Sequence, residues 1–295
     1  MLLNKYFLCP WPIQFLQDEL SGILTGDFVM LAMGSGGGKS TFSRALVNKA
    51  RQHGTPVVLY SLEDERGKYA MTNVYYKYIS AGGTMNYRDW LLDKTLNPGK
   101  YEIFFQKAAD ESMLESNGLP LVTTHEDPNL TMNQVMRQML VELKAGYRLF
   151  VIDHVDCLCP SERPEDMVAT MTRLWNFVSE YQATIITFSQ LAGRRNMQAL
   201  CPALDDLRGS KAKIFKPTIV LSLARHDYGL YTNYPGKPTY CRILKNRDNG
   251  QNKAAVVFFQ NGGYLPDYKI VDCNESGTRI DGETMASLSK KTMPS

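Results

Sequence analysis

The sequence predicts an α/β P-loop NTPase core: a mostly parallel, twisted sheet flanked by helices, with a C-terminal antiparallel hairpin. Three observations support this fold class. Short apolar runs alternate with amphipathic stretches, which is typical of strands joined by crossover helices. A glycine-rich segment ending in Gly-Lys-Ser-Thr directly follows one of the apolar runs. The last two strand segments are separated by a short polar turn, which favours antiparallel pairing.

The predicted strands are short, apolar and rich in β-branched or aromatic residues. The early ones are nearly continuous hydrophobic runs, as expected for strands buried on both faces of a parallel sheet. In chain order they are Phe28–Ala32, Val57–Ser61, Leu119–Thr123, Leu149–Asp153, Thr184–Ser189, Ile219–Leu223, Tyr240–Leu244 and Ala254–Phe259.

Two amphipathic helices stand out between these strands. In Thr131–Ala145 the apolar residues recur at steps of three and one, which places them on one helix face. Thr131 and Gln134 have the spacing of a capping box, and Gly146 is a typical C-terminal residue. Glu165–Gln182 repeats the apolar pattern, and in both helices the methionine and aromatic stripes indicate core packing.

The composition bounds the class of protein. The chain has 295 residues, of which 44% are hydrophobic and 21% charged, so a wholly disordered chain is excluded. No apolar stretch approaches the roughly 18–20 residues needed to cross a bilayer, and the N-terminus lacks the pattern of a secretory signal. Six cysteines without a Cys-x-x-Cys pair fit free thiols in the cytoplasm. The net charge of +3 by itself gives no indication of nucleic-acid binding.

We expect three segments along the chain. Residues 1–19 form an N-terminal arm, residues 20–272 form the ATPase domain, and residues 273–295 form a polar, mobile tail. The arm is apolar enough either to pack on a neighbouring subunit or to cover its own core.

The strongest local signal is MGSGGGKST at residues 33–41. Its end matches the P-loop pattern, although Met33 stands where the pattern has its first glycine. The glycines let backbone N–H groups approach phosphate, and the following helix presents its N-terminus to the same anion. Lys39 is expected to contact the β- and γ-phosphates of ATP, and Ser40 to help hold Mg²⁺. The predicted nucleotide-binding residues of this loop are Gly34, Ser35, Gly36, Gly37, Gly38, Lys39, Ser40 and Thr41.

Phosphoryl transfer also needs a carboxylate on the metal side and a group that positions the attacking water. Asp153 ends an apolar strand and is the candidate on the metal side, with Asp156 in the loop beyond it. Glu63 ends the second strand and is the candidate general base. Because Asp64 and Glu65 are adjacent to it, spacing alone leaves that choice open. Gln190 ends a further strand, where its amide is expected to sense the γ-phosphate.

These motifs together resemble the RecA-type motor domain of the hexameric replicative DNA helicases, which include the DnaB group, the phage primase-helicases and mitochondrial Twinkle. The resemblance spans about residues 20–265 and depends on the order of the motifs. LFVIDHVDCL and RILKNRDNGQ lean toward the phage and mitochondrial branch, and the minimal length favours a phage-borne protein. The matching segments are LSGILTGDFVMLAMGSGGGKST, YSLEDE, LFVIDHVDCL, ITFSQLAGRR, LDDLRGSKAKIFKPTIVLSLAR and RILKNRDNGQ.

The resemblance assigns further roles. It selects Glu63 from its acidic neighbours as the catalytic base. It implies that Lys245 and Arg247 complete the ATP site of a neighbouring subunit, whereas the residues alone are also compatible with a solvated hairpin turn. It places Arg225 near the nucleotide base, although an ordinary surface arginine explains that residue nearly as well.

The resemblance also implies that loops facing a central channel bind single-stranded DNA through its phosphates. The alternative is a set of solubilising surface charges. The family's GSGA is GSKA here, so Lys211 replaces a glycine and changes the loop's path or adds a phosphate contact. The residues expected at this DNA interface are Arg194, Arg195, Arg208, Gly209, Lys211 and Lys213.

The leading hypothesis is an ATP- and Mg²⁺-dependent helicase motor, hexameric when active, that translocates on single-stranded DNA in the 5′ to 3′ direction implied by the family. The chain begins about 30 residues before the phosphate loop, so we expect the family's N-terminal primase or helical collar to be absent, with a separate primase or loader as partner. A second hypothesis is a recombinase-like or regulatory RecA-fold ATPase that forms rings or filaments without unwinding. A third is a non-catalytic ATP-binding switch, which the set Glu63, Asp153 and Arg247 disfavours.

Overall fold

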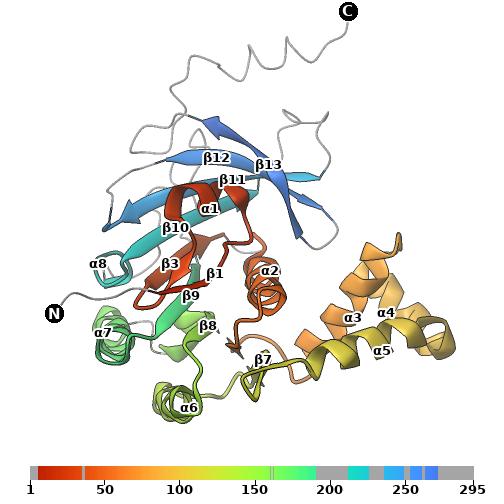
Figure 1. Ribbon diagram of the computed structural model, residues 1–295, viewed down its shortest axis with the longest axis horizontal. Coiled ribbons are helices and arrows are strands. Elements are labelled where there is room, and N and C mark those ends of the chain that lie inside the picture. Colours follow the sequence, from red (N-terminus) through yellow and green to blue (C-terminus); the bar gives the residue numbers. More distant parts are fainter. Residues whose placement is uncertain are drawn as a thin grey trace, which may run out of the picture.

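A nine-stranded sheet forms the centre of the molecule (Figure 1). The computed structural model describes residues 6–34, 37–159, 161, 163–190, 212–225, 236–248, 253–260 and 263–271. In sheet order the strands are β13 (Gly263–Val271), β12 (Ala254–Gln260), β11 (Lys237–Asn246), β10 (Ile219–Arg225), β3 (Phe28–Met33), β9 (Thr184–Gln190), β8 (Leu149–Asp153), β4 (Val57–Ser61) and β7 (Val122–Glu126).

Six strands, from β10 to β7, are mutually parallel, and β11 to β13 extend the sheet in antiparallel fashion. This confirms the predicted fold class, including the hairpin of β11 and β12. The predicted strand 119–123 is instead divided between β6 (Leu119–Pro120), which pairs with β5 (Glu115–Ser116), and β7. Sequence analysis also missed β13, in which much of the strand is exposed and apolar alternation is weak.

The buried parallel strands alternate between two cores. Phe28, Met30 and Ala32 of β3 pack with α6 (Met132–Ala145) and α7 (Pro164–Tyr181) on one face of the sheet. The intervening residues of β3 pack with α1 (Gln14–Leu20) and α2 (Lys39–Gln52) on the other face. Since both faces are covered, the continuous hydrophobic pattern of these strands follows directly.

The N-terminal segment covers its own core. Trp11, Ile13, Phe15 and Leu16 are at most 2% exposed and belong to the cluster around α2. Just before them, β1 (Phe7–Cys9) pairs with β2 (Ile23–Leu24). Of the two roles considered for residues 1–19, the described part therefore has the intramolecular one.

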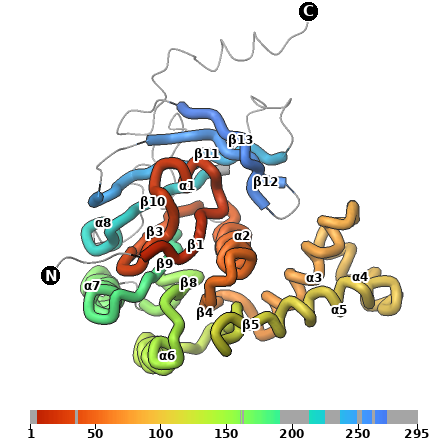
Figure 2. Tube along the Cα trace, in the orientation of Figure 1, coloured from red at the N-terminus to blue at the C-terminus, as the bar shows by residue number. Residues whose placement is uncertain are grey.

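A helical unit projects from the β7 side of the sheet (Figures 1 and 2). It contains α3 (Lys68–Ser80), α4 (Tyr87–Leu96), the 3₁₀ turn η1 (Pro98–Tyr101) and α5 (Glu102–Ser112). Val74, Trp90 and Tyr101 form its small aromatic core. Glu111 of α5 pairs with Arg51 of α2 and Lys77 of α3, which ties the unit to the main domain. Within the described part of the chain, no helix is long and apolar enough to span a membrane.

Candidate active site

The glycine-rich loop has the local geometry of a phosphate cradle. The N–H of Gly37 donates to the carbonyl oxygen of Gly34 at 2.9 Å, and a Cβ on Gly37 would lie 2.8 Å from that oxygen. Gly38 has φ +100° and directly precedes the first residue of α2, Lys39. Both positions therefore require glycine. Lys39 is 9% exposed, Ser40 and Thr41 follow in the first turn of α2, and Ser35 and Gly36 lie outside the described residues.

Strand register brings the other predicted residues to the same edge of the sheet. Gln190 of β9 is paired with Met33 of β3, where the phosphate loop begins. Asp153 of β8 is paired with Ser61 of β4, two residues before Glu63. Since all four strands are parallel, their carboxyl ends meet at one edge, which is where open α/β sheets bind ligands.

Asp153 has the environment expected of a ligand to a cation. Its side chain is buried, and the Ser43 hydroxyl donates to its Oδ2 at 3.1 Å. Burial raises the pKa of Asp153, and the nearby hydroxyls of Ser43 and Ser40 and the imidazole of His154 oppose that rise. Within the described structure its Oδ1 is buried without a hydrogen-bond partner. A buried, unsatisfied carboxylate oxygen beside the start of α2 fits Mg²⁺ coordination by Asp153 and Ser40.

The three neighbouring acids after β4 are in different environments. Asp64 pairs with Arg44 at 3.2 Å and accepts a hydrogen bond from the Ser61 hydroxyl at 3.1 Å. Glu65 is exposed. Glu63 is 48% exposed, and its Oε1 lies 2.9 Å from Nε2 of His154, the residue that follows Asp153. This geometry separates Glu63 from its neighbours, which spacing alone did not.

His154 is a site residue that sequence reasoning missed. Its side chain is 7% exposed and lies between two carboxylates, Glu63 and Asp156. Burial alone would lower the pKa of His154, but its contacts, chiefly with Asp156, Cys157 and Glu63, outweigh burial and raise the pKa to about 10. His154 is therefore a cation at neutral pH. The one sequence signal was its position directly after the acid that ends β8.

Asp156 lies in the short 3₁₀ turn η2 (Val155–Leu158) rather than in a loop. Its Oδ2 accepts the backbone N–H of Gln190 at 3.2 Å and lies 3.2 Å from Nδ1 of His154. Its Oδ1 pairs with the ammonium of Lys213. Burial opposes ionisation of Asp156, yet these three contacts hold its pKa well below the ordinary value.

Lys213 therefore differs from the sequence expectation. It lies in α8 (Ala212–Phe215), and its side chain is only 1% exposed because it is paired with Asp156. In this arrangement it does not present its charge to a DNA channel. The other residues expected to bind DNA, which are Arg194, Arg195, Arg208, Gly209 and Lys211, lie outside the described residues.

Lys245 and Arg247 contact carbonyl groups at the end of α8 in their own chain. The Lys245 ammonium donates to the carbonyl oxygens of Ile214 (2.7 Å), Phe215 (3.2 Å) and Pro217 (2.8 Å). The Arg247 guanidinium donates to the Phe215 carbonyl and lies 5.3 Å from the ring centre of Trp175. Arg225 ends β10, and its side chain is not described.

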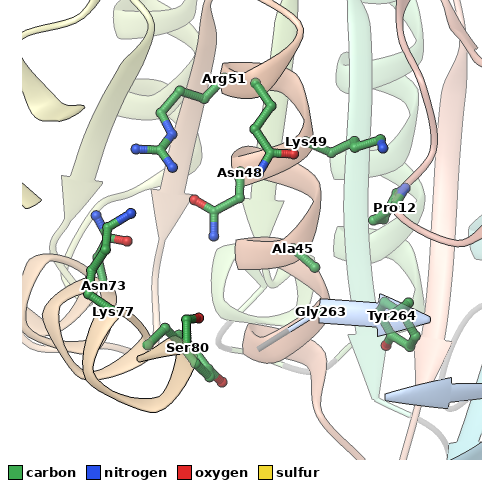
Figure 3. A pocket seen from close by; sticks show the side chains of 12 residues that line it. Pro12, Ala45, Asn48, Lys49, Arg51, Asn73, Lys77, Ser80, Gly263 and Tyr264 are labelled. Carbon is green, nitrogen blue, oxygen red and sulfur yellow. The ribbon is translucent and has the colours of Figure 1, made fainter. Parts of the chain in front are cut away.

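Two cavities lie away from this edge. One, of about 290 Å³, is polar and lies beside α2, with residues from α3 and the start of β13 on its other sides (Figure 3). In it Lys49 extends toward Pro12, whereas Arg51 and Lys77 lie on the opposite side of α2 (Figure 3). The other, of about 480 Å³, lies between α3, α5 and β7 and is mostly apolar. Neither contains a predicted site residue.

Comparisons with known proteins agree with this architecture. Residues 12–264 match the family described as DnaB-like helicase C terminal domain. A search of curated proteins gives no match. Among solved structures, the ATPase domain of a DnaB-like helicase is similar with TM-score 0.69 and 18% identity, over 87% of this chain and 90% of that one.

Two further structures have the same fold. A DnaB-like replicative helicase, solved with its interactions with primase, has TM-score 0.71 and 19% identity over 89% of this chain. This chain covers 64% of that helicase. A KaiC-like protein from the hyperthermophilic archaeon Pyrococcus horikoshii OT3 has TM-score 0.59 and 16% identity, over 89% of this chain and 98% of that protein. At these identities the likeness shows a common RecA-like ATPase fold.

Proposed function

The chain belongs to the DnaB-like helicase C terminal domain family, and on that premise we propose that it is an ATP-hydrolysing motor that translocates on single-stranded DNA and unwinds duplex DNA. One observation carries the catalytic part of this proposal. The phosphate loop, Asp153, Glu63 and Gln190 come from four separate strand ends and converge on one edge of the parallel sheet. That is the set of groups that phosphoryl transfer from ATP to water requires.

The roles follow from position and charge. The glycine loop and Lys39 bind the β- and γ-phosphates, and Ser40 and Asp153 would hold Mg²⁺, which neutralises charge on the phosphates when bound. Glu63 orients a water molecule and accepts its proton as the water oxygen bonds to the γ-phosphorus and the bond to the β-phosphate oxygen breaks. Gln190 has a backbone link to Asp156 and an amide at the same edge, which suits a sensor of the γ-phosphate.

Lys245 and Arg247 are proposed to complete the site of a neighbouring protomer in a hexameric ring. Charge accumulates on the transferring phosphoryl group, and cationic side chains stabilise it. Both residues lie near the end of β11, close to α8, and Arg247 is exposed. Arg225 is proposed to lie near the nucleotide base, and Arg194, Arg195, Arg208, Gly209 and Lys211 to contact DNA phosphates.

Strand displacement on a forked duplex with ATP tests the whole proposal. We expect unwinding by the wild type, six-membered rings in particle images with ATP and single-stranded DNA, and loss of DNA-stimulated hydrolysis in Lys39→Ala and Arg247→Ala. Unchanged hydrolysis in both variants would reject the site. Filaments, or hydrolysis without unwinding, would instead indicate the recombinase-like or regulatory ATPase.

A further inference from the structure

The one-turn helix α8 contacts the candidate catalytic edge through a buried cation. The Lys213 side chain is 1% exposed and pairs with Asp156, which is 27% exposed. Replacing a buried ion pair with apolar residues is often neutral or stabilising, so such a pair is weak evidence for a role in stability. A role in geometry is the stronger explanation for this one.

From Asp156 the contacts continue to the candidate base. The Asp156 Oδ2 lies 3.2 Å from Nδ1 of His154, and Nε2 of His154 lies 2.9 Å from Oε1 of Glu63. Charges alternate along this series, from the ammonium of Lys213 to the carboxylate of Glu63, so each contact is attractive. Among the described contacts, the ion pair with His154 is the one that fixes the half-exposed carboxylate of Glu63.

The far end of the same helix holds the residues proposed to act on a neighbour. The carbonyls of Ile214, Phe215 and Pro217 accept hydrogen bonds from Lys245, and that of Phe215 also accepts one from Arg247. A displacement of α8 would therefore disturb both the support of Glu63 and the anchorage of these two cations.

We propose that Lys213, Asp156 and His154 are positioning residues that fix the carboxylate of Glu63 for water activation and link it, through α8, to Lys245 and Arg247. This inference rests on the proposed ATP hydrolysis at this site. It predicts that breaking the series impairs the chemical step while leaving nucleotide binding intact, because none of its three members belongs to the phosphate loop.

Steady-state ATP hydrolysis with saturating single-stranded DNA tests the series in Lys213→Met. Small displacements of a reacting group can cost about 100-fold in rate, so we expect kcat to fall by about that factor. The KM for ATP and the Kd of a non-hydrolysable ATP analogue should stay within about twofold, as expected when only the transition state is affected. Lys213→Arg should retain most of the kcat, and Lys144→Met, at an exposed lysine of α6, should match the wild type.

The double variant Asp156→Asn/Lys213→Met removes both charges, so it leaves neither of the two buried and unpaired. It should be folded, as judged by its thermal unfolding, and should show the same loss of kcat with unchanged analogue binding. A folded double variant with wild-type kcat would overturn the positioning role and leave the proposed function standing. A wild type without DNA-stimulated hydrolysis would overturn the proposed function itself.

Discussion

At the scale of single residues, the run Glu63, Asp64 and Glu65 shows how environment assigns chemistry to similar side chains. Asp64 is engaged by Arg44 and Ser61, Glu65 is exposed, and Glu63 faces His154 beside Asp153. We expect Glu63→Gln to lower kcat for ATP hydrolysis by about 100- to 10,000-fold, because general-base catalysis contributes that range.

Glu65→Gln is the matched control for that change and should hydrolyse ATP at the wild-type rate. ATP binding, measured with a fluorescent analogue, should persist in both variants. Full activity in Glu63→Gln combined with a loss in Glu65→Gln would assign the base to Glu65 instead.

The charge of Lys245 gives a pH-dependent contribution to stability. Burial and the nearby Arg247 lower its pKa from 10.5 to about 8. Between these values the unfolded chain binds more protons than the folded chain, so this lysine's contribution to the free energy of unfolding rises with pH from about 8 to 10.5.

Lys245→Met removes that contribution. Chemical denaturation of both proteins without nucleotide at pH 7.5 and 10 should show wild-type stability increasing relative to the variant as pH rises. A difference between the two proteins that stays constant or shrinks would contradict the lowered pKa.

The residues that sequence identified and those it missed differ in kind. Lys39, Ser40, Asp153 and Glu63 are tied to strand ends and to a glycine pattern, so local sequence places them at one edge. Lys213 depends on contact with Asp156, 57 positions away, and a cation's letter does not distinguish a buried ion pair from a surface charge. For this reason Lys213 was expected at a DNA interface and is found inside the protein.

At the scale of elements, α6 was predictable and the projecting helices were not. The apolar stripe of α6 faces one core, and Thr131 and Gln134 form the predicted capping box. In α3 the tyrosines and methionines are spread around the helix, and much of its packing is with α5 of the same unit. No segregated apolar face marks such a helix in the sequence.

The capping box provides a test of that local prediction. The Thr131 hydroxyl accepts the N–H of Gln134, and the Gln134 side chain accepts the N–H of Thr131 at 2.8 Å. Thr131→Ala should lower the free energy of unfolding by about 1 kcal/mol, the usual contribution of such a cap. Thr131→Ser keeps the hydroxyl and should be close to the wild type in urea denaturation, whereas equal losses in both variants would argue against the cap.

At the scale of the whole molecule, the proposed site is divided between protomers. Glu63 belongs to the half that binds ATP, and Arg247 is the exposed residue lent to the neighbour. In a ring of head-to-tail interfaces, each interface therefore pairs the base of one chain with the arginine of the next.

Mixing two inactive variants tests this division. Homogeneous Glu63→Gln and Arg247→Ala should each lack DNA-stimulated hydrolysis, since every interface has one defect. In a 1:1 mixture that assembles at random in the presence of DNA, about a quarter of the interfaces join an intact Glu63 to an intact Arg247. Activity should therefore reappear on mixing, and a Lys39→Ala/Glu63→Gln chain should restore Arg247→Ala equally well because its arginine is intact. If Glu63 and Arg247 acted within one chain, no mixture would recover activity, because neither variant supplies both groups.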